Sequence, residues 1–262
     1  MTIPKSGRRR IGRDASAGTG IAELIETLAG WDLTVYSAVN GLATRSGAAD
    51  EFVEGLSGSH LAKCVPVMML FWGLWFADER VGRATRPKLL AVLATTLVAI
   101  GLGRLLTAVL PFRSRPLHTP WLESNLPAVL DPDTLDGWNS MPSDHAVLFF
   151  TLAVGFWLVN RWAGLAVLLH TLLVISLPRV YLGLHFPSDI LVGGILGAII
   201  ALAMVPRIAG FLDRRALVDR LVDHGYIWYP VMFLITYESA TLFVGTRNAG
   251  RTLVHITVAY AS

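Results

Sequence analysis

The chain has 262 residues, of which 53% are hydrophobic and 16% are charged, and its formal net charge at pH 7 is +3. This balance is too apolar for an ordinary soluble domain and indicates a membrane protein. The single cysteine, Cys64, excludes an internal disulfide, a Cys-x-x-Cys redox pair and a multi-cysteine zinc site. The cations are concentrated in a few segments, which is typical of cytoplasmic loops and gives no reason to expect a nucleic-acid partner.

The first thirteen residues are strongly basic and contain Lys5, Arg8, Arg9, Arg10 and Arg13. A basic start is typical of a signal peptide, which continues into an uncharged apolar stretch of about 7–15 residues. Here Glu23, Glu26 and Asp32 interrupt the segment that follows. We therefore expect residues 1–30 to remain as a basic segment on the cytoplasmic side of a membrane.

Five apolar runs are candidates for membrane-crossing helices, which need about 20 mostly apolar residues. They cover residues 61–77, 89–110, 146–159, 163–177 and 190–205. A weaker run at 31–43 carries Asp32 and Asn40 and is either a first crossing or an interfacial helix. Another run at 227–244 contains Glu238, which is either a paired structural residue or part of a cavity wall.

The sequence therefore predicts an all-α fold, a polytopic membrane helix bundle of six or seven transmembrane helices. We expect residues 31–206 to form the transmembrane core. The remaining residues, 207–262, form a C-terminal segment that supplies the seventh helix if residues 227–244 cross the membrane.

The loops differ in charge between the two sides of this bundle. If residues 31–43 cross, the basic loops at 78–88 and 207–220 lie on the same side as the N-terminus, and the positive-inside rule makes that side cytoplasmic. The opposite face carries residues 111–145 and 178–189, where most of the side chains suited to chemistry gather. We expect this extracytoplasmic face to hold the functional site.

Two segments on that face share the tripeptide Pro-Ser-Asp directly before an apolar run. They are residues 142–144 in MPSDHAVLFF and 187–189 in FPSDILVGG. Proline in the first turn and a Ser or Asp cap are typical of helix starts. Two crossings separate them, so both helix N-termini emerge on one side, where their free N–H groups suit a phosphate or a similar anion. The alternative is that both helices simply need caps.

Four arginines accompany these helix starts: Arg104, Arg113, Arg115 and Arg179. Guanidinium groups bind phosphate oxygens through paired hydrogen bonds and stay ionised in a partly dry site. A solvated loop or snorkelling explains any one of them. Four on one face indicate an anion site, although Arg113 and Arg115 are two residues apart and need not point the same way.

Two histidines and an aspartate complete the candidate catalytic set. His185 and Asp189 have the spacing of one helix face, but Pro187 intervenes, so we place His185 just before the helix and Asp189 in its first turn. A carboxylate bonded to one imidazole nitrogen fixes the tautomer and makes the other nitrogen a nucleophile. His145 follows the other cap and is available as a proton donor. The same three residues could hold a metal, but the arginines would repel a cation, so we expect an anion and no metal.

The other histidines carry less information. We expect satisfied structural roles for an isolated histidine in an apolar chain, which here means His60, His170, His224 and His255. His118 lies close to the arginines in sequence, and both a structural and a functional role stay open for it.

These motifs resemble the type 2 phosphatidic acid phosphatase superfamily, which includes membrane lipid phosphatases and soluble vanadium haloperoxidases. Its pattern is Lys, six residues, Arg-Pro; then Pro-Ser-Gly-His; then Ser-Arg, five residues, His, three residues, Asp. The second part is similar to residues 142–145, with Asp144 in place of Gly. The third part is similar to residues 178–189, with Pro178 in place of Ser.

The first part of the pattern is the least faithful. Arg115 and the proline after it match, but Ala108 occupies the lysine position. Either Arg104, one turn earlier, or Arg113 would have to supply the missing cation. The resemblance covers roughly residues 60–206.

The resemblance implies a mechanism for these residues. His185 attacks phosphorus and forms a phosphohistidine, Asp189 orients it, and His145 protonates the departing oxygen. The equatorial oxygens are stabilised by Arg115, Arg179, Ser143 and a further arginine. Asp144, an anomaly beside an anion, acts through its backbone N–H with its side chain turned away. Neither a metal nor another cofactor is implied.

The leading functional hypothesis is an extracytoplasmic phosphatase for a lipid phosphate or diphosphate. Undecaprenyl diphosphate or another isoprenoid carrier is the first choice by analogy, with phosphatidylglycerol phosphate, phosphatidate and lipid A as alternatives. A phosphotransferase is a near variant, in which an acceptor hydroxyl replaces water. The expected partners are the lipid substrate and membrane lipids, while the oligomeric state stays open.

Two other classes compete with the phosphatase. An anion or lipid transporter could use the same arginines and helix ends, but it gives no reason for a His–Asp pair facing a second histidine. A haloperoxidase would need a soluble helical shell, against which the apolar runs argue.

Overall fold

The computed structural model describes residues 30–77 and 79–240, and every regular element within these ranges is helical. The all-α prediction is therefore confirmed for this part of the chain. The basic segment before residue 30, His255 and the end of the predicted run at 227–244 lie outside the described residues.

The helices follow one another with short connections except between α4 and α5. A helix at residues 30–40 comes first. The labelled elements are then α2 (Gly47–Gly58), α3 (His60–Trp75), α4 (Glu79–Val109), the short 3₁₀ helix η1 (Pro116–His118), α5 (Asp144–Val159), α6 (Arg161–His170), the π-helical η2 (Thr171–Ser176), α7 (Leu177–Tyr181), α8 (Pro187–Arg214), α9 (Leu217–Asp223) and α10 (Gly225–Ala240).

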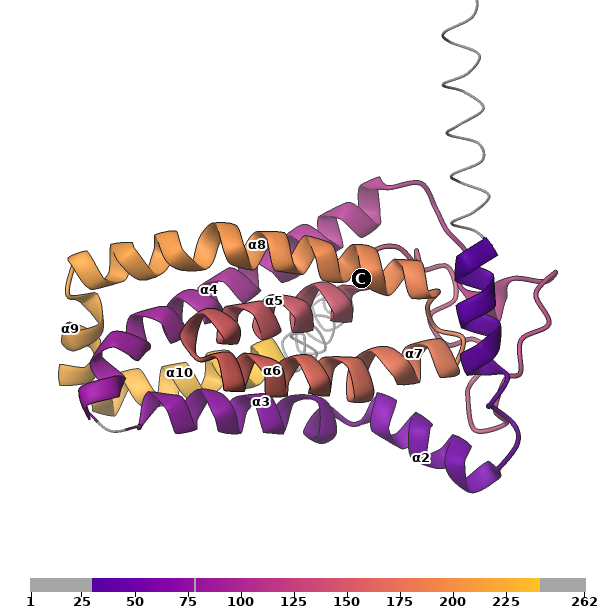
Figure 1. The fold of residues 1–262 in the computed structure, drawn as a ribbon, viewed down its shortest axis with the longest axis horizontal. Coiled ribbons are helices and arrows are strands. Elements are labelled where there is room, and N and C mark those ends of the chain that lie inside the picture. Colours follow the sequence, from indigo (N-terminus) through magenta and orange to yellow (C-terminus); the bar gives the residue numbers. More distant parts are fainter. Residues whose placement is uncertain (1–29, 78, 241–262) are drawn as a thin grey trace, which may run out of the picture.

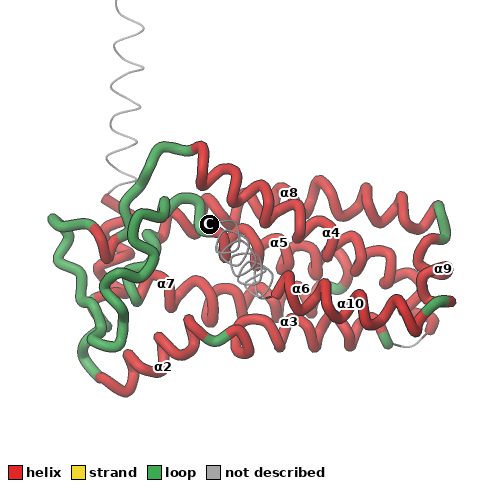
Figure 2. The backbone as a smooth tube through the Cα atoms, turned by 180° about the vertical axis from the view of Figure 1, so that it is seen from behind, coloured by secondary structure: helices red, strands yellow, loops and turns green. Residues whose placement is uncertain are grey.

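The long helices run side by side and form a bundle around α5, which packs against α4, α6 and α8 (Figures 1 and 2). The segments α6, η2 and α7 form one helical rod, Arg161–Tyr181. The contact between α5 and α8 is close because of Gly197, where a Cβ atom would lie 2.4 Å from the backbone oxygen of Val147. This approach fixes the start of α5 against α8.

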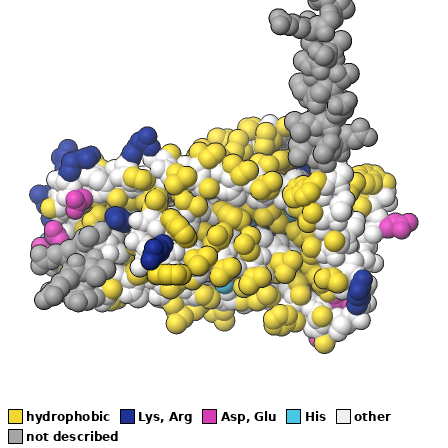
Figure 3. All heavy atoms as spheres, in the orientation of Figure 1, with side chains coloured by type: hydrophobic (Ala, Val, Ile, Leu, Met, Phe, Trp, Pro, Cys, Tyr) yellow, Lys and Arg dark blue, Asp and Glu magenta, His cyan; other side chains and the backbone are white. Residues whose placement is uncertain are grey.

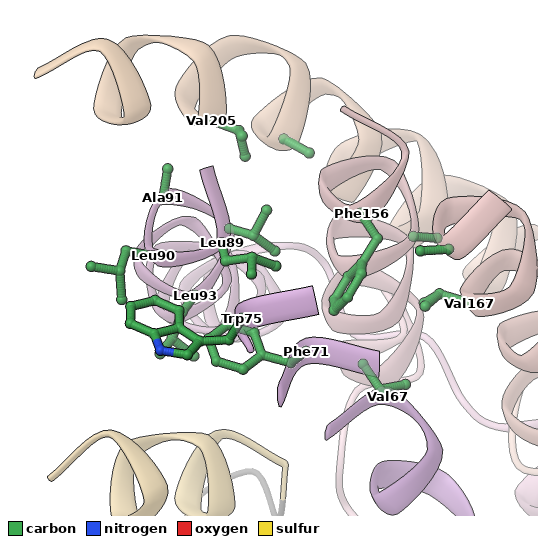
Figure 4. Packing of buried hydrophobic residues seen from close by; sticks show 14 of the residues in the cluster. Val67, Phe71, Trp75, Leu89, Leu90, Ala91, Leu93, Phe156, Val167 and Val205 are labelled. Atoms are coloured by element: carbon green, nitrogen blue, oxygen red, sulfur yellow. The ribbon is translucent and has the colours of Figure 1, made fainter. Parts of the chain in front are cut away.

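Large apolar side chains fill the bundle between α9 and the middle of α5 (Figure 4). Phe71 and Trp75 of α3 stack on each other with their ring centroids 6.1 Å apart. Leu89 of α4 and Phe156 of α5 are fully buried in the same cluster. Close packing of this kind gives the opposite end of the bundle a rigid support.

Three described helical segments are long and apolar enough to cross a membrane: Thr85–Val109, Arg161–Tyr181 and Pro187–Arg214. The helices His60–Trp75 and Asp144–Val159 are apolar but shorter. Many large apolar side chains are exposed between the two ends, and they cover much of the face shown in Figure 3, as lipid contact requires. The protein is therefore a membrane protein, while the number of six or seven crossings stays a prediction.

The helix at residues 30–40 runs across the loop end of the bundle and not along its length (Figure 1). Its two polar residues, Asp32 and Asn40, are buried. The Asn40 amide donates hydrogen bonds to the backbone oxygens of Asn125 and Tyr181, at 3.0 and 2.8 Å. Of the two alternatives for the run at 31–43, this placement favours the interfacial helix, whose polar residues hold the loops.

Candidate active site

A cavity of about 350 Å³ opens at the loop end of the bundle. Six parts of the chain contribute to it: the end of α2, the start of α3, the end of α4, the long α4–α5 loop, the start of α5 and the segment from α7 to α8. Its lining residues are Gly58, His60, Lys63, Arg104, Thr107, Arg115, Leu135, Trp138, Asn139, Pro142, Asp144, His145, Arg179 and His185. The cavity therefore brings together both predicted catalytic histidines and three of the four predicted arginines.

His185 lies just before α8, as the proline after it predicts, and is almost fully buried. Its Nδ1 is 2.9 Å from the backbone oxygen of Ser140. Because a carbonyl oxygen can only accept, Nδ1 carries the hydrogen and Nε2 keeps its lone pair. Arg115 Nη1 lies 3.1 Å from this free Nε2.

The His185 imidazole is neutral at neutral pH. The pKa of His185 is lowered to about 4 by burial and by the positive charges of Arg115 and Arg179, against the Asp189 carboxylate, which raises it. Burial is the largest of these effects. A neutral imidazole with one protonated and one free nitrogen is the form that can attack an electrophile.

Asp189 lies in the first turn of α8, as predicted, and is fully buried. One of its oxygens, Oδ2, accepts hydrogen bonds from Ser140 Oγ at 2.5 Å and from the Phe186 N–H at 2.8 Å. The same oxygen lies 3.7 Å from His185 Nδ1, which is ion-pair range and longer than a hydrogen bond. The carboxylate thus acts on the imidazole electrostatically, and through Ser140, whose carbonyl holds Nδ1.

Arg113 lies behind this pair and does not line the cavity, unlike the other three predicted arginines. Its Nη1 donates to Asp189 Oδ1 at 2.6 Å and to Ser188 Oγ at 2.7 Å, and its Nη2 donates to Asp32 Oδ2 at 2.6 Å. The guanidinium also lies over the Phe186 ring, 4.5 Å from its centroid. Arg113 is therefore placed to support Asp189.

The Asp32 carboxylate also binds the N-terminus of α8. Its Oδ1 accepts the Ser188 N–H at 2.8 Å, and its Oδ2 accepts the Ser188 hydroxyl at 2.6 Å. Both Pro-Ser-Asp segments do start helices, as predicted, but at α8 the Ser188 N–H already binds this carboxylate. Only the start of α5 lies at the cavity, through Pro142, Asp144 and His145.

Arg115 and Arg179 are both buried and supply the strongest positive charge at the cavity. Arg115 donates to the backbone oxygens of Leu184 and Asn139. The buried side-chain atoms without a hydrogen-bond partner among the described residues include three at predicted site residues, Arg115 Nε, Arg179 Nε and Ser143 Oγ, and both of these arginines line the cavity. Buried polar groups are nearly always paired, so unpaired donors beside a cavity indicate a binding site for an acceptor-rich group.

Arg104 and Asp144 face each other between α4 and α5. The Arg104 guanidinium lies 3.6 Å from Asp144 Oδ2, and both side chains are about one-third exposed. Thr107 Oγ1 lies 3.4 Å from the other Asp144 oxygen. The Asp144 side chain thus pairs with two residues of α4. This pairing weakens the repulsion between Asp144 and an anion, and it also partly neutralises the Arg104 charge.

Backbone contacts fix the two histidine segments against each other. The Ser143 N–H, at the N-cap of α5, donates to the Asp189 backbone oxygen at 3.1 Å. Asn139 joins the loop to α4, since its amide donates to the Thr107 oxygen at 3.1 Å and accepts from the Arg113 N–H at the same distance. His145, in α5, and His185, just before α8, therefore enter one cavity from separate segments.

Sequence reasoning missed three residues at this site: Lys63, Asn139 and Ser140. A charged residue inside an apolar run is a signal that could have identified Lys63. His60 was expected to be structural, yet it lines the cavity. His118 bonds the Thr134 oxygen at 3.1 Å and does not line the cavity, which favours its structural alternative.

The other predicted structural histidines have backbone partners. His170 Nε2 lies 2.8 Å from the Lys63 oxygen, and His224 Nδ1 lies 3.0 Å from the Arg220 oxygen. Within residues 30–77 and 79–240, no three His, Cys, Asp or Glu side chains are grouped as a metal site would require.

Comparisons with known proteins place the site in a family. Residues 88–211 match the PAP2 superfamily model. Over 98 residues the chain is 35% identical to the putative undecaprenyl-diphosphatase YbjG of Escherichia coli K12, covering 37% of this chain and 46% of that protein. It is 28% identical over 141 residues to the bacitracin transport permease protein BcrC of Bacillus licheniformis, covering 52% and 64%.

Two further proteins are similar to the chain. The lipid A 1-diphosphate synthase of Escherichia coli K12 is 29% identical over 140 residues, which cover 52% of this chain and 58% of that protein. The chain thus spans about half to two thirds of the curated relatives. A crystal structure of Aquifex aeolicus LpxE is similar at 24% identity and a TM-score of 0.43, covering 65% of this chain and 92% of that one. Residues 88–211, which hold both cavity histidines that were predicted to be catalytic, are a domain of the PAP2, or type 2 phosphatidic acid phosphatase, superfamily.

Proposed function

We propose that the protein is an integral membrane phosphatase that hydrolyses a lipid phosphate or diphosphate through a phosphohistidine. One observation carries this proposal: the unpaired donors of Arg115 and Arg179 line the same cavity as a neutral His185 whose Nε2 carries no hydrogen, with the unpaired Ser143 hydroxyl at the start of α5. A phosphate group supplies the acceptor oxygens that such donors lack. The PAP2 domain supports the same chemistry.

In the proposed first step, His185 Nε2 attacks the terminal phosphorus and the bond to the leaving oxygen breaks. His145 donates a proton to that oxygen, and this proton neutralises the negative charge that the oxygen would otherwise carry away. Arg115 moves from Nε2 to a phosphate oxygen, and Arg179 binds another, which stabilises the charge of the transition state. The Ser140 carbonyl and the Asp189 carboxylate stabilise the positive charge on the imidazole ring of the phosphohistidine.

In the second step, water replaces the lipid. His145, now neutral, accepts a proton from the water as its oxygen attacks phosphorus, and the bond to His185 Nε2 breaks. Inorganic phosphate leaves, and His185 returns to its neutral form with Nδ1 protonated. Only side chains of this chain act in these steps, so we propose that neither a metal nor another cofactor takes part.

Isoprenoid diphosphates such as undecaprenyl diphosphate are the proposed substrates. The name of the YbjG relative, a putative undecaprenyl-diphosphatase, supports this choice. The relative named lipid A 1-diphosphate synthase supports a phosphotransferase as the second candidate, in which an acceptor hydroxyl takes the place of water. Phosphatidylglycerol phosphate, phosphatidate and lipid A stay alternatives for the substrate.

We also propose that the cavity opens on the extracytoplasmic side of the cell membrane. Lys and Arg side chains gather at the α9 end of the bundle, opposite the cavity (Figure 3). They include Lys88, Arg207, Arg214, Arg215 and Arg220. The positive-inside rule then assigns the α9 end to the cytoplasm.

The decisive assay measures phosphate release by purified protein from prenyl diphosphates, phosphatidylglycerol phosphate, phosphatidate and lipid A. The reactions run with EDTA and without an added acceptor. Release from a prenyl diphosphate under these conditions supports the proposal. Release only after an acceptor lipid is added favours the phosphotransferase, and binding without release favours a transporter.

The acid limit of activity should lie well below the usual histidine pKa. Protonated His185 cannot attack, and its pKa is lowered to about 4, so kcat/KM should stay high as the pH falls through 6 and decline only near pH 4. The measurement is a profile of kcat/KM against pH, corrected for the separately titrated ionisation of the lipid phosphate. A limb near the ordinary histidine pKa of about 6.5 would contradict the geometry described for His185.

The contact between Asp32 and Arg113 should matter for turnover although it lies outside the cavity. Asp32→Asn removes the charge that holds Arg113 and Ser188, so Asp189 loses its fixed orientation. We expect kcat to fall about 10-fold with little change in KM, the scale of one charge-assisted hydrogen bond of about 1.5–3 kcal/mol. Steady-state kinetics with a prenyl diphosphate provide the measurement.

Asp50→Asn is the matched control for this change. Asp50 is also buried at the loop end, where it accepts hydrogen bonds from the Tyr181 hydroxyl and the Thr44 N–H. Within the described residues it forms no hydrogen bond or ion pair with Arg113 or Asp189. An equal fall in kcat for both variants would show general loosening of the loops and no specific role for Asp32.

A further inference from the structure

Lys63 is a buried cation that the proposed chemistry leaves unused. It is the fourth residue of α3, is 5% exposed, and lines the same cavity as Arg179, His145 and His185. It also lies close enough to Arg179 for the two charges to repel each other. A buried ammonium group is costly unless an anion compensates it.

The described residues supply little compensation for this charge. Lys63 Nζ donates one hydrogen bond, at 2.7 Å, to the Ser57 backbone oxygen at the end of α2. An ammonium group has three N–H donors, so two have no described partner. No described carboxylate lies within ion-pair distance of it. The α2 contact therefore holds the side chain in place without neutralising it.

The charges around the cavity are also unbalanced. Four cations line it, namely Lys63, Arg104, Arg115 and Arg179, against the single described carboxylate Asp144. Asp144 already pairs with Arg104. Three positive charges are left, whereas one terminal phosphate carries about −1.5 to −2 near pH 7. The excess fits a ligand with a further ionised oxygen.

Lys63 comes from a different part of the chain than the donors assigned to the terminal phosphate. Arg115, Arg179 and Ser143 come from the α4–α5 loop, α7 and the N-cap of α5. Lys63 enters instead from the α3 wall, which it forms with His60 and Gly58. A second phosphate attached to the first would extend away from His185 and could meet a cation on a different wall.

We propose that Lys63 binds the non-scissile phosphate of a diphosphate substrate and thereby selects lipid diphosphates over lipid monophosphates. This inference rests on the proposed phosphatase function. During phosphoryl transfer the bond between the terminal phosphorus and the bridging oxygen breaks, and the leaving lipid phosphate gains negative charge. The Lys63 ammonium group stabilises that charge, and it is a catalytic residue only for substrates that carry the second phosphate.

The test compares two substrates of the same chain length, a prenyl diphosphate and the corresponding prenyl monophosphate. Lys63→Met keeps the apolar stem and removes the charge. We expect it to lower kcat/KM for the diphosphate about 10- to 100-fold, the scale of a charge-assisted hydrogen bond, and to leave kcat/KM for the monophosphate within about 3-fold. Lys63→Arg should restore most of the activity toward the diphosphate.

Three controls keep the outcomes separate. Lys88→Met removes the exposed lysine at the opposite end of the bundle and should change neither activity. Lys63→Gln, which can still donate to the Ser57 oxygen, replaces the methionine variant if that variant does not fold. Retained monophosphate turnover shows that each variant is folded.

An equal loss toward both substrates would overturn the proposal, because Lys63 would then bind the terminal phosphate. An unchanged activity toward the diphosphate would overturn it as well, because the buried charge would then be structural. A wild-type protein that releases phosphate from neither substrate would instead refute the phosphatase function itself.

Discussion

His185→Ala is expected to abolish phosphate release while leaving the fold and the anion site in place. The variant loses the proposed nucleophile, Nε2, which lies beside Arg115 Nη1 at 3.1 Å. Removing a catalytic nucleophile costs several orders of magnitude, so we expect kcat to fall at least about 10³-fold. The measurement is phosphate release from a prenyl diphosphate by purified wild-type and variant protein.

A binding measurement distinguishes this result from a transporter. Arg115, Arg179 and Ser143 keep their positions in His185→Ala, so the lipid diphosphate should still bind within about 10-fold of the wild-type affinity. His118→Ala is the matched control, because His118 lies at the same end, bonds a backbone oxygen and does not line the cavity. Turnover in His185→Ala equal to that of His118→Ala would refute the assignment of the nucleophile.

Arg179→Met should separate activity from stability. The Arg179 guanidinium is buried and forms no hydrogen bond or ion pair with the described residues, and its Nε is unpaired. Losing one preorganised donor to the transition state typically costs about 10²–10³ in kcat. A buried charge without a partner destabilises a fold, so methionine of similar length should leave the melting temperature unchanged or raise it.

The opposite pattern would contradict this account of Arg179. If activity survives and the melting temperature falls, the guanidinium is a structural group. Arg45→Met is the control, because Arg45 lies at the same end, is exposed, and bonds only the Gly41 oxygen. It should change neither kcat nor thermal stability in detergent.

The apolar runs and the cap motifs predicted the helices well, because burial in lipid and helix capping both act locally in sequence. The run at 61–77 corresponds to α3, His60–Trp75, and the run at 146–159 to α5, Asp144–Val159. The two Pro-Ser-Asp segments start α5 and α8. The run at 31–43 was ambiguous, since its polar residues are buried by tertiary contacts that its own sequence does not reveal.

The site was predictable only where spacing along the chain decides position. His185 and Asp189 lie on one turn, so their proximity follows from local geometry. The path of the irregular loop decides which way Arg113 and Arg115 point, and it sends Arg113 to Asp32 while Arg115 enters the cavity. Lys63 and Ser140 reach the site through the packing of separate segments, which one sequence does not specify.

The stereochemistry at phosphorus tests the central claim, transfer through His185, most directly. The substrate is a prenyl diphosphate analogue with a terminal thiophosphate made chiral by oxygen isotopes, hydrolysed in water enriched in a third isotope. Two successive in-line displacements, one by His185 and one by water, predict inorganic thiophosphate with retained configuration. Inverted configuration would mean that water attacks the substrate directly, and it would contradict the phosphohistidine.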